Sequence, residues 1–142
     1  MLTPMLQPFH FAFFVRDLVS TRRFYGDVLG CREGRSTESW VDFDFFGNQI
    51  SAHNTGEPLP TENTGRVDGV PVPMPHFGAI LPWNVFLSIA DRIRAAGIAF
   101  ILEPTIRYSG QPGEQATMFL YDPSGNALEF KSFKHPEHVF TA

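Results

Sequence analysis

An internal repeat limits the possible folds of this 142-residue chain more than any other feature of its sequence. The two copies begin at His10 and His76 and read HFAFFVRDLVSTRRFYGDVLG and HFGAILPWNVFLSIADRIRAAG. Each copy starts as an apolar strand, passes into a helical pattern and stops at a glycine, as helices commonly do. In the second copy, Asn84 is predicted to cap the helix. The repeat therefore predicts two halves of similar structure.

The residues after each helix also correspond. Three strand-like runs follow in both halves, and the last two are joined by a turn that contains Gly-Asn. Halves shorter than roughly 70 residues make poor independent domains. We therefore predict a single α+β domain over residues 1–142. Its parts are a first half at about 7–54, a connector at 55–73, a second half at about 74–133 and a tail at 134–142.

Composition restricts the partners of the chain. The net charge of −4 and the pI near 5.7 argue against binding to nucleic acid or to an anionic membrane. A single cysteine, Cys31, excludes an intrachain disulfide and is typical of a reducing compartment. No apolar run approaches the ~20 residues of a membrane-spanning helix. We expect a soluble cytoplasmic domain.

Three polar residues lie in strand-like runs that otherwise look buried. They are His10, His76 and Glu129, and strand alternation places each beside a small residue two positions away. The apolar neighbours of Glu129, Leu128 and Phe130, point to the opposite face, where a helix would cover them. The three polar side chains are thus predicted to face a space rather than a packed core.

A single histidine in a strand is more often a hydrogen-bonded core or rim residue than a ligand, and a single glutamate at a strand edge is usually solvated. Two histidines at equivalent positions of a repeat, together with a carboxylate, support a different interpretation. Two imidazoles and a carboxylate form the facial triad that holds a divalent metal with positions open for substrate or oxygen.

The motifs FYGDVLG, PHFGAIL and DPSGNALEF carry a family likeness. Over residues 7 to 133 the chain resembles the vicinal oxygen chelate superfamily, which includes glyoxalase I, extradiol dioxygenases, fosfomycin-resistance transferases and bleomycin-resistance proteins. The resemblance implies paired βαβββ modules that form a cupped mixed sheet around a metal. It also implies His10, His76 and Glu129 as ligands, a substrate that chelates the metal through two neighbouring oxygens, and a homodimer.

The first half departs from one branch of this family. Ser51 aligns with Glu129 in the repeat. By resemblance, glyoxalase I would have a second glutamate at the position of Ser51, so the serine argues against glyoxalase I chemistry. Gln49 and His53 share the face of Ser51. We predict that Gln49 and Ser51 contact substrate and that His53 carries a proton, since its ordinary pKa lies near operating pH. A rim histidine with a structural hydrogen bond is an equal alternative.

The second half departs from another branch. By resemblance, an extradiol dioxygenase would have a tyrosine at the position of Phe119 and a histidine several residues upstream. This chain has a phenylalanine there, and its upstream segment PGEQATM contains no histidine. Phe119 is predicted to contact substrate. The segment 103–115 is an insertion relative to the first half, and it is either a lid that brings Arg107 and Tyr108 to an acidic or aromatic substrate or a solvated hairpin loop.

These features lead to three functional hypotheses. The first is a metal-dependent, dioxygenase-like enzyme with Fe(II) as the favoured ion and Mn, Ni or Zn as alternatives. The second is a lyase or thiol transferase of the same fold. The third is a metal-free protein that sequesters an aromatic drug, and the three ligand-type residues argue against it.

Overall fold

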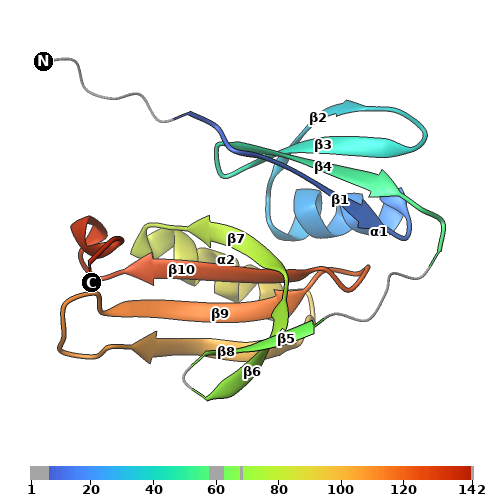
Figure 1. Ribbon diagram of the computed structural model, residues 1–142. Helices are drawn as coiled ribbons and strands as arrows, with labels where there is room; N and C mark the ends of the chain where they lie inside the picture. Colours follow the sequence, from blue (N-terminus) through green and yellow to red (C-terminus); the bar gives the residue numbers. More distant parts are fainter. Residues whose placement is uncertain (1–6, 58–62, 68, 142) are drawn as a thin grey trace, which may run out of the picture. The chain divides into compact units, whose positions relative to one another are not determined.

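The computed structural model describes residues 7–57, 63–67 and 69–141 (Figure 1). The chain divides into two compact units, residues 1–59 and 60–142, which are described here one at a time. Each unit contains a four-stranded mixed sheet, and the strand orders β1-β4-β3-β2 and β7-β10-β9-β8 are equivalent. The two pseudo-symmetric α+β halves predicted from the repeat are confirmed.

The first unit follows the predicted order of a strand, a helix and three strands. In its sheet, β1 pairs in parallel with the hairpin strand β4, and β3 pairs antiparallel with both β4 and β2. The elements are β1 (His10–Val15), α1 (Leu18–Arg22), the π-helical η1 (Arg23–Val28), β2 (Arg32–Ser36), β3 (Trp40–Phe45) and β4 (Asn48–Asn54).

The helical segment of the first unit packs on one face of its sheet. Asp17 caps α1 by accepting a hydrogen bond from the backbone N–H of Ser20 at 2.7 Å. Tyr25 in η1 is fully buried, and its ring centroid lies 5.5 Å from that of Phe43 and 5.8 Å from that of Phe13. Strand alternation leaves the other face of the sheet to the polar residues.

The second unit repeats this topology with a longer helix. Strand β10 again pairs in parallel with the first strand, here β7, and antiparallel with β9, which also pairs with β8. The elements are β7 (His76–Ile80), α2 (Trp83–Ala95), β8 (Phe100–Arg107), β9 (Gln115–Tyr121), β10 (Ala127–Phe133) and the 3₁₀ helix η2 (Pro136–His138).

Helix α2 covers one face of the second sheet (Figure 1). Leu128 and Phe130 of β10 are fully buried, as predicted. The predicted cap at Asn84 is wrong, because the helix begins at Trp83 and Pro82 is the N-cap residue, without a side-chain hydrogen bond. Proline has a fixed φ, here −57°, and is well suited to start a helix. No helix in the described ranges is long and apolar enough to cross a membrane.

The predicted connector contains regular structure that the sequence did not indicate. Strands β5 (Asn63–Val67) and β6 (Val70–Met74) form an antiparallel hairpin. Pro71 and Pro73 lie in β6, and proline is tolerated in such a ribbon because one side of each strand needs no ladder donor. Residues 58–62 and 68 of the predicted connector lie outside the described residues.

The insertion at 103–115 is partly strand. Strand β8 continues to Arg107, which pairs with Gln115, so only residues 108–114 form the turn between β8 and β9. The proline at 104 had suggested a loop, but β8 is the edge strand of its sheet, where proline is tolerated. Residues 103–115 therefore form part of a β-hairpin, and the role of its turn as a lid stays a prediction.

Candidate metal-binding site

Two of the three predicted ligands lie together in the second unit. Strand pairing sets Ala127 opposite His76 and Glu129 opposite Gly78, so the His76 and Glu129 side chains are diagonal neighbours. Nε2 of His76 lies 3.2 Å from Oε1 of Glu129. The side chains are 18% and 9% exposed, which places a carboxylate and an imidazole together at a largely desolvated position.

Gly78 is required by the approach of the two strands that carry this pair. A Cβ atom at this position would lie 1.5 Å from the carbonyl oxygen of Glu129 and 2.5 Å from its carbonyl carbon. The sequence had suggested that the small residue leaves space for a ligand. The structure gives another reason, since the glycine lets β7 and β10 pair closely beside the carboxylate.

The imidazole of His76 is fixed in one tautomer by the backbone. Nδ1 lies 2.8 Å from the carbonyl oxygen of Pro73, and a carbonyl oxygen only accepts, so Nδ1 carries the proton. The ring also meets Phe119 edge to face, with centroids 4.9 Å apart at 86°. Nε2 is therefore the nitrogen presented to Glu129.

The carboxylate of Glu129 is oriented by Thr117 on the neighbouring strand β9. The fully buried Thr117 hydroxyl donates a hydrogen bond to Oε2. Oε1 then faces Nε2 of His76, and both atoms are electron-pair donors when the imidazole is neutral. Two such atoms are stable at this distance only with a proton or a cation between them.

The separation of these two atoms fits a shared metal ion. Metal–nitrogen and metal–oxygen bonds in proteins are about 2.0–2.2 Å long. Two ligands that subtend 90–100° at such an ion lie about 3.0–3.2 Å apart. The observed 3.2 Å between Nε2 and Oε1 agrees with this range. The donor set, its burial and its spacing therefore suit a divalent metal.

Phe119 supports the pair from the same face of the sheet. It lies directly opposite Glu129 in the β9–β10 pairing and is fully buried. Its edge-to-face contact with His76 makes it part of the wall behind the imidazole. The predicted contact of Phe119 with substrate stays a prediction.

His10, the third predicted ligand, opens β1 in the first unit and is exposed. Its Nδ1 atom lies 2.8 Å from Oε1 of Gln49, the residue directly opposite on β4. An amide oxygen only accepts, so Nδ1 carries the proton here as well, and Nε2 has the lone pair. Gln49, predicted to contact substrate, thus orients the histidine.

Ser51 meets a carboxylate that the sequence analysis missed. Its hydroxyl donates to Oδ1 of Asp42 at 2.5 Å, and Gln49 Nε2 lies 3.5 Å from Oδ2 of the same residue. Asp42 is directly opposite Ser51 in the β3–β4 pairing. The alternation in VDFDFF, with two aspartates between buried apolar residues, places Asp42 on the polar face and could have revealed it.

Gln115 is a second residue that the sequence analysis did not select. It lies two positions before Thr117 on β9 and shares its face. Nε2 donates to the carbonyl of Gly113 at 3.2 Å, while Oε1 is buried and has no hydrogen-bond partner among the described residues. An unpaired buried acceptor costs about 1–3 kcal/mol, so a donor from substrate or water fits here.

The two remaining predicted residues are exposed. His53 lies opposite Trp40, with ring centroids 6.3 Å apart. Tyr108 is in the β8–β9 turn, where the guanidinium of Arg107 lies over its ring at 4.9 Å and donates to its hydroxyl at 3.1 Å. The proton-carrier role of His53 and the substrate contact of Tyr108 stay predictions.

The complete three-residue site is likewise a prediction. Within residues 7–57, 63–67 and 69–141, no group of three or more His, Cys, Asp or Glu side chains is placed to hold a metal. The structure brings His76 and Glu129 together in one unit and holds His10 in the same tautomer in the other.

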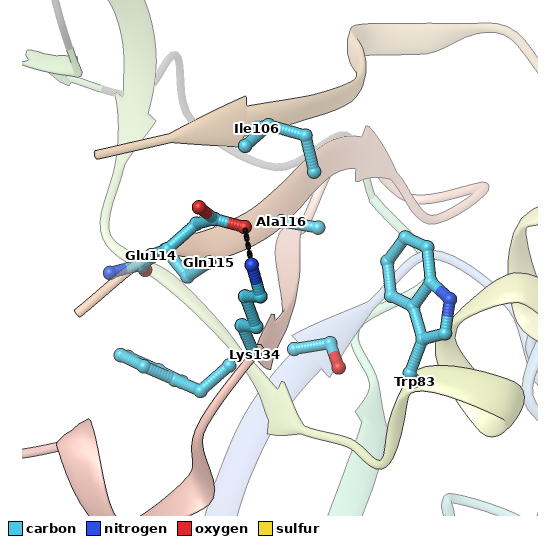
Figure 2. A pocket seen from close by; sticks show the side chains of 8 residues that line it. Trp83, Ile106, Glu114, Gln115, Ala116 and Lys134 are labelled. Atoms are coloured by element: carbon cyan, nitrogen blue, oxygen red, sulfur yellow. Dashed lines mark ion pairs between the residues drawn. The ribbon is translucent and has the colours of Figure 1, made fainter. Parts of the chain in front are cut away.

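A cavity of about 300 Å³ in the second unit lies away from this pair (Figure 2). Its lining includes Ala116 and Ser132, which alternate with Thr117 and Glu129 and so point to the opposite face of the sheet. Trp83 lies on one side of the cavity, and the ion pair of Glu114 with Lys134, 3.7 Å long, lies on the other. Gln115 and Phe133 also line the cavity, so it lies at the end of β9 and β10 and reaches both faces of the sheet.

The repeated fold and the strand-borne ligand-type residues agree with a sequence comparison. Residues 7–130 match the Glyoxalase/Bleomycin resistance protein/Dioxygenase superfamily. The chain belongs to this superfamily, and the family resemblance predicted from its motifs is confirmed.

Solved structures with the same fold cover nearly the whole chain. A glyoxalase/bleomycin resistance protein/dioxygenase from Alicyclobacillus acidocaldarius is 29% identical, with a TM-score of 0.78, covering 94% of this chain and 96% of that one. The fosfomycin resistance protein FosX from Listeria monocytogenes is 19% identical, with a TM-score of 0.69 and coverage of 97% and 98%. A glyoxalase/dioxygenase from Nostoc punctiforme is also 19% identical, with a TM-score of 0.68 and coverage of 95% and 100%. The last two likenesses show the fold alone.

Proposed function

We propose that this protein is a metal-dependent, dioxygenase-like enzyme that acts on a small molecule with two neighbouring oxygen atoms. His10, His76 and Glu129 would hold the metal. The observation that carries the proposal is the pairing of His76 Nε2 with Glu129 Oε1 at 3.2 Å, a separation that fits two ligands of one ion. A homodimer is part of the proposal, and a monomeric mass in solution would count against it.

The orientation of the two histidines supports this proposal. Nδ1 of His76 donates to a backbone carbonyl, and Nδ1 of His10 donates to an amide oxygen. Histidines that bind metal typically donate their second ring N–H to such an acceptor, which fixes the tautomer and the ring orientation. Both imidazoles therefore present Nε2 as the ligating atom.

Two imidazoles and one carboxylate favour Fe(II), with Mn, Ni or Zn as alternatives. Such an ion would bind the substrate oxygens and act as a Lewis acid or oxygen activator. The protein residues would supply orientation and proton transfer. Thr117 keeps the carboxylate of Glu129 in place, Gln49 and Ser51 line the face beside His10, and His53 is the proposed proton carrier.

The first experiment measures metal by elemental analysis after anaerobic purification. We expect about one divalent ion per chain in the wild type, and a loss of affinity of at least about 100-fold in Glu129→Ala, because removal of a ligand costs more than removal of a residue that orients one. Glu114→Gln is the matched control, since Glu114 is a carboxylate of the same unit that pairs with Lys134 beside the separate cavity. A wild type that takes up none of Fe, Mn, Ni or Zn would refute the metal-dependent function and favour a metal-free binding protein.

The second experiment separates the reaction types. The Fe(II)-loaded protein is tested for oxygen consumption with a panel of catechols and related vicinal diols. Uptake that depends on Glu129 supports the dioxygenase-like reaction. Tight metal binding without any oxygen uptake would instead point to a lyase or thiol transferase, a reaction class that uses the same ligands as a Lewis-acid site.

A further inference from the structure

We infer that Asp42 is a positioning residue that acts through Gln49 to hold His10 in the tautomer that presents Nε2. This inference rests on the proposed metal-binding function of His10. Asp42 makes no described hydrogen bond with His10 itself. Its effect passes through a network of hydrogen-bonded side chains on one face of the first sheet.

Strand register places the side chains of this network next to one another. Gln49 of β4 lies between His10 of β1 and the polar face of β3, and Ser51, two residues further along β4, lies opposite Asp42. The hydrogen bonds run from Nδ1 of His10 to Oε1 of Gln49 at 2.8 Å and from Nε2 of Gln49 to Oδ2 of Asp42 at 3.5 Å.

The directions of these bonds follow from the chemistry of the groups. A carboxylate only accepts hydrogen bonds, so the amide group of Gln49 must turn its NH₂ toward Asp42. The amide oxygen then faces His10 and requires a donor, which places the proton on Nδ1. If the amide turned over, its NH₂ would donate to Nδ1, and the proton would move to Nε2. A protonated Nε2 of a neutral imidazole cannot bind a metal.

Ser51 holds Asp42 from the other side. Its buried hydroxyl donates to Oδ1 at 2.5 Å, so the two carboxylate oxygens have separate donors. This contact also explains the residue at position 51. A glutamate there, as at Glu129 in the repeat, would set a second carboxylate against Asp42, and like charges directly opposite in a sheet are destabilising.

His76 needs no such network of side chains, because the carbonyl of Pro73 fixes its tautomer directly. No side-chain substitution removes a backbone carbonyl, whereas the acceptor behind His10 depends on Gln49 and Asp42. The inference therefore predicts an effect of substitution that is confined to one of the two histidines.

The test uses ¹⁵N NMR of the histidine rings in the metal-free protein, about two pH units above the ordinary histidine pKa of ~6.5. We expect the Nδ1–H form for both His10 and His76 in the wild type. In Asp42→Ala, the His10 resonances should move toward the Nε2–H form while those of His76 stay unchanged. Gln49→Met, at an exposed position, should give the same result without a change in the sheet.

Asp44→Ala is the matched control. Asp44 is the next carboxylate on the same face of β3, but its side chain accepts from the backbone N–H of Gly47 and pairs with Arg32. Asp44 lies directly opposite Gln49 in the strand pairing but makes no described hydrogen bond to it, so its removal takes away the same charge and leaves the hydrogen bonds between His10, Gln49 and Asp42 in place. Unchanged His10 resonances in Asp42→Ala and Gln49→Met, or an equal shift in Asp44→Ala, would overturn the inference.

Metal affinity provides the second readout. Substitution of residues that orient a ligand typically lowers metal affinity 10–100-fold, so we expect about a tenfold loss in Asp42→Ala and in Gln49→Met. A wild type that binds no metal but shows the predicted tautomers would refute the proposed function alone. A wild type that binds metal while His10 is insensitive to Asp42 would refute the positioning role alone.

Discussion

The two halves share one topology but place their carboxylates on different strands. In the second half, Glu129 lies on the central strand β10 and the apolar Phe119 is directly opposite on β9. In the first half, Ser51 takes the corresponding place on β4, and the carboxylate, Asp42, is opposite on β3. At equivalent positions of the two sheets, the carboxylate is therefore a candidate ligand in the second half and a supporting residue in the first.

The strand pairs that carry the two histidines also differ. Ala12 lies two residues after His10 and pairs with Ser51, whereas Gly78 lies two residues after His76 and pairs with Glu129. The first pair accommodates a methyl group and the second does not. The pairing of β7 with β10 beside Glu129 is therefore sensitive to an added methyl group, whereas the pairing of β1 with β4 beside Ser51 already contains one.

Gly78→Ala should have the largest effect. The added Cβ would overlap the carbonyl group of Glu129, so β7 and β10 must separate. We expect a loss of about 3 kcal/mol or more in the free energy of unfolding, since overpacking against backbone cannot relax easily. Urea denaturation measures it.

Ala12→Gly is the counterpart in the first half and should cost only about 0.5–1 kcal/mol, from the greater freedom of glycine in the unfolded chain. Equal losses for the two substitutions would show that the strand pairs do not differ in this way.

Thr117→Val should have an intermediate effect. Valine keeps the shape but removes the hydroxyl that donates to the buried Glu129 carboxylate. A hydrogen bond to a charged group contributes about 1.5–3 kcal/mol, and we expect a loss in this range by thermal or urea unfolding.

Ser51→Ala, the matching change in the first half, should cost about 1 kcal/mol or less. Its partner Asp42 is half-buried, so water can replace the lost donor. A larger loss for Ser51→Ala than for Thr117→Val would contradict the difference in burial between the two carboxylates.

The smallest difference in stability between the two halves is expected from the N-terminal caps of their helices. Hydrogen bonds from Ser20 hold the pKa of Asp17 below its ordinary value, while α2 has no side-chain cap. A carboxylate with a lowered pKa contributes stability above its unfolded pKa of about 3.9, and this contribution is lost as the pH falls through the lower folded value. Asp17→Ala should cost about 1 kcal/mol at neutral pH.

Hydrogen exchange of the amides in the first helix, measured between neutral pH and about pH 3, tests this prediction. Protection in the wild type should fall in the acidic part of the range, and Asp17→Asn, which keeps a capping oxygen, should remove that dependence. An acid response of equal size in α2 would argue against Asp17 as its source.

Much of the fold could be predicted because the relevant signals are local. The alternation around Glu129 identified its face and the burial of Leu128 and Phe130, and the helical spacing after His76 identified α2. The predicted cap at Asn84 was wrong, because the N-cap residue is Pro82, two residues earlier. Local patterns fix the type of an element more firmly than its ends.

The sequence by itself determined that the chain has two equivalent halves, which face of each strand is polar, and which residues on those faces are candidate ligands. Only the tertiary structure decided that Asp42 meets Ser51, that Thr117 holds Glu129, and that Gly78 makes room for a backbone. The physical reason is that alternation is encoded along one strand, whereas the neighbour of each side chain depends on the register between strands, which the packing of the whole unit sets.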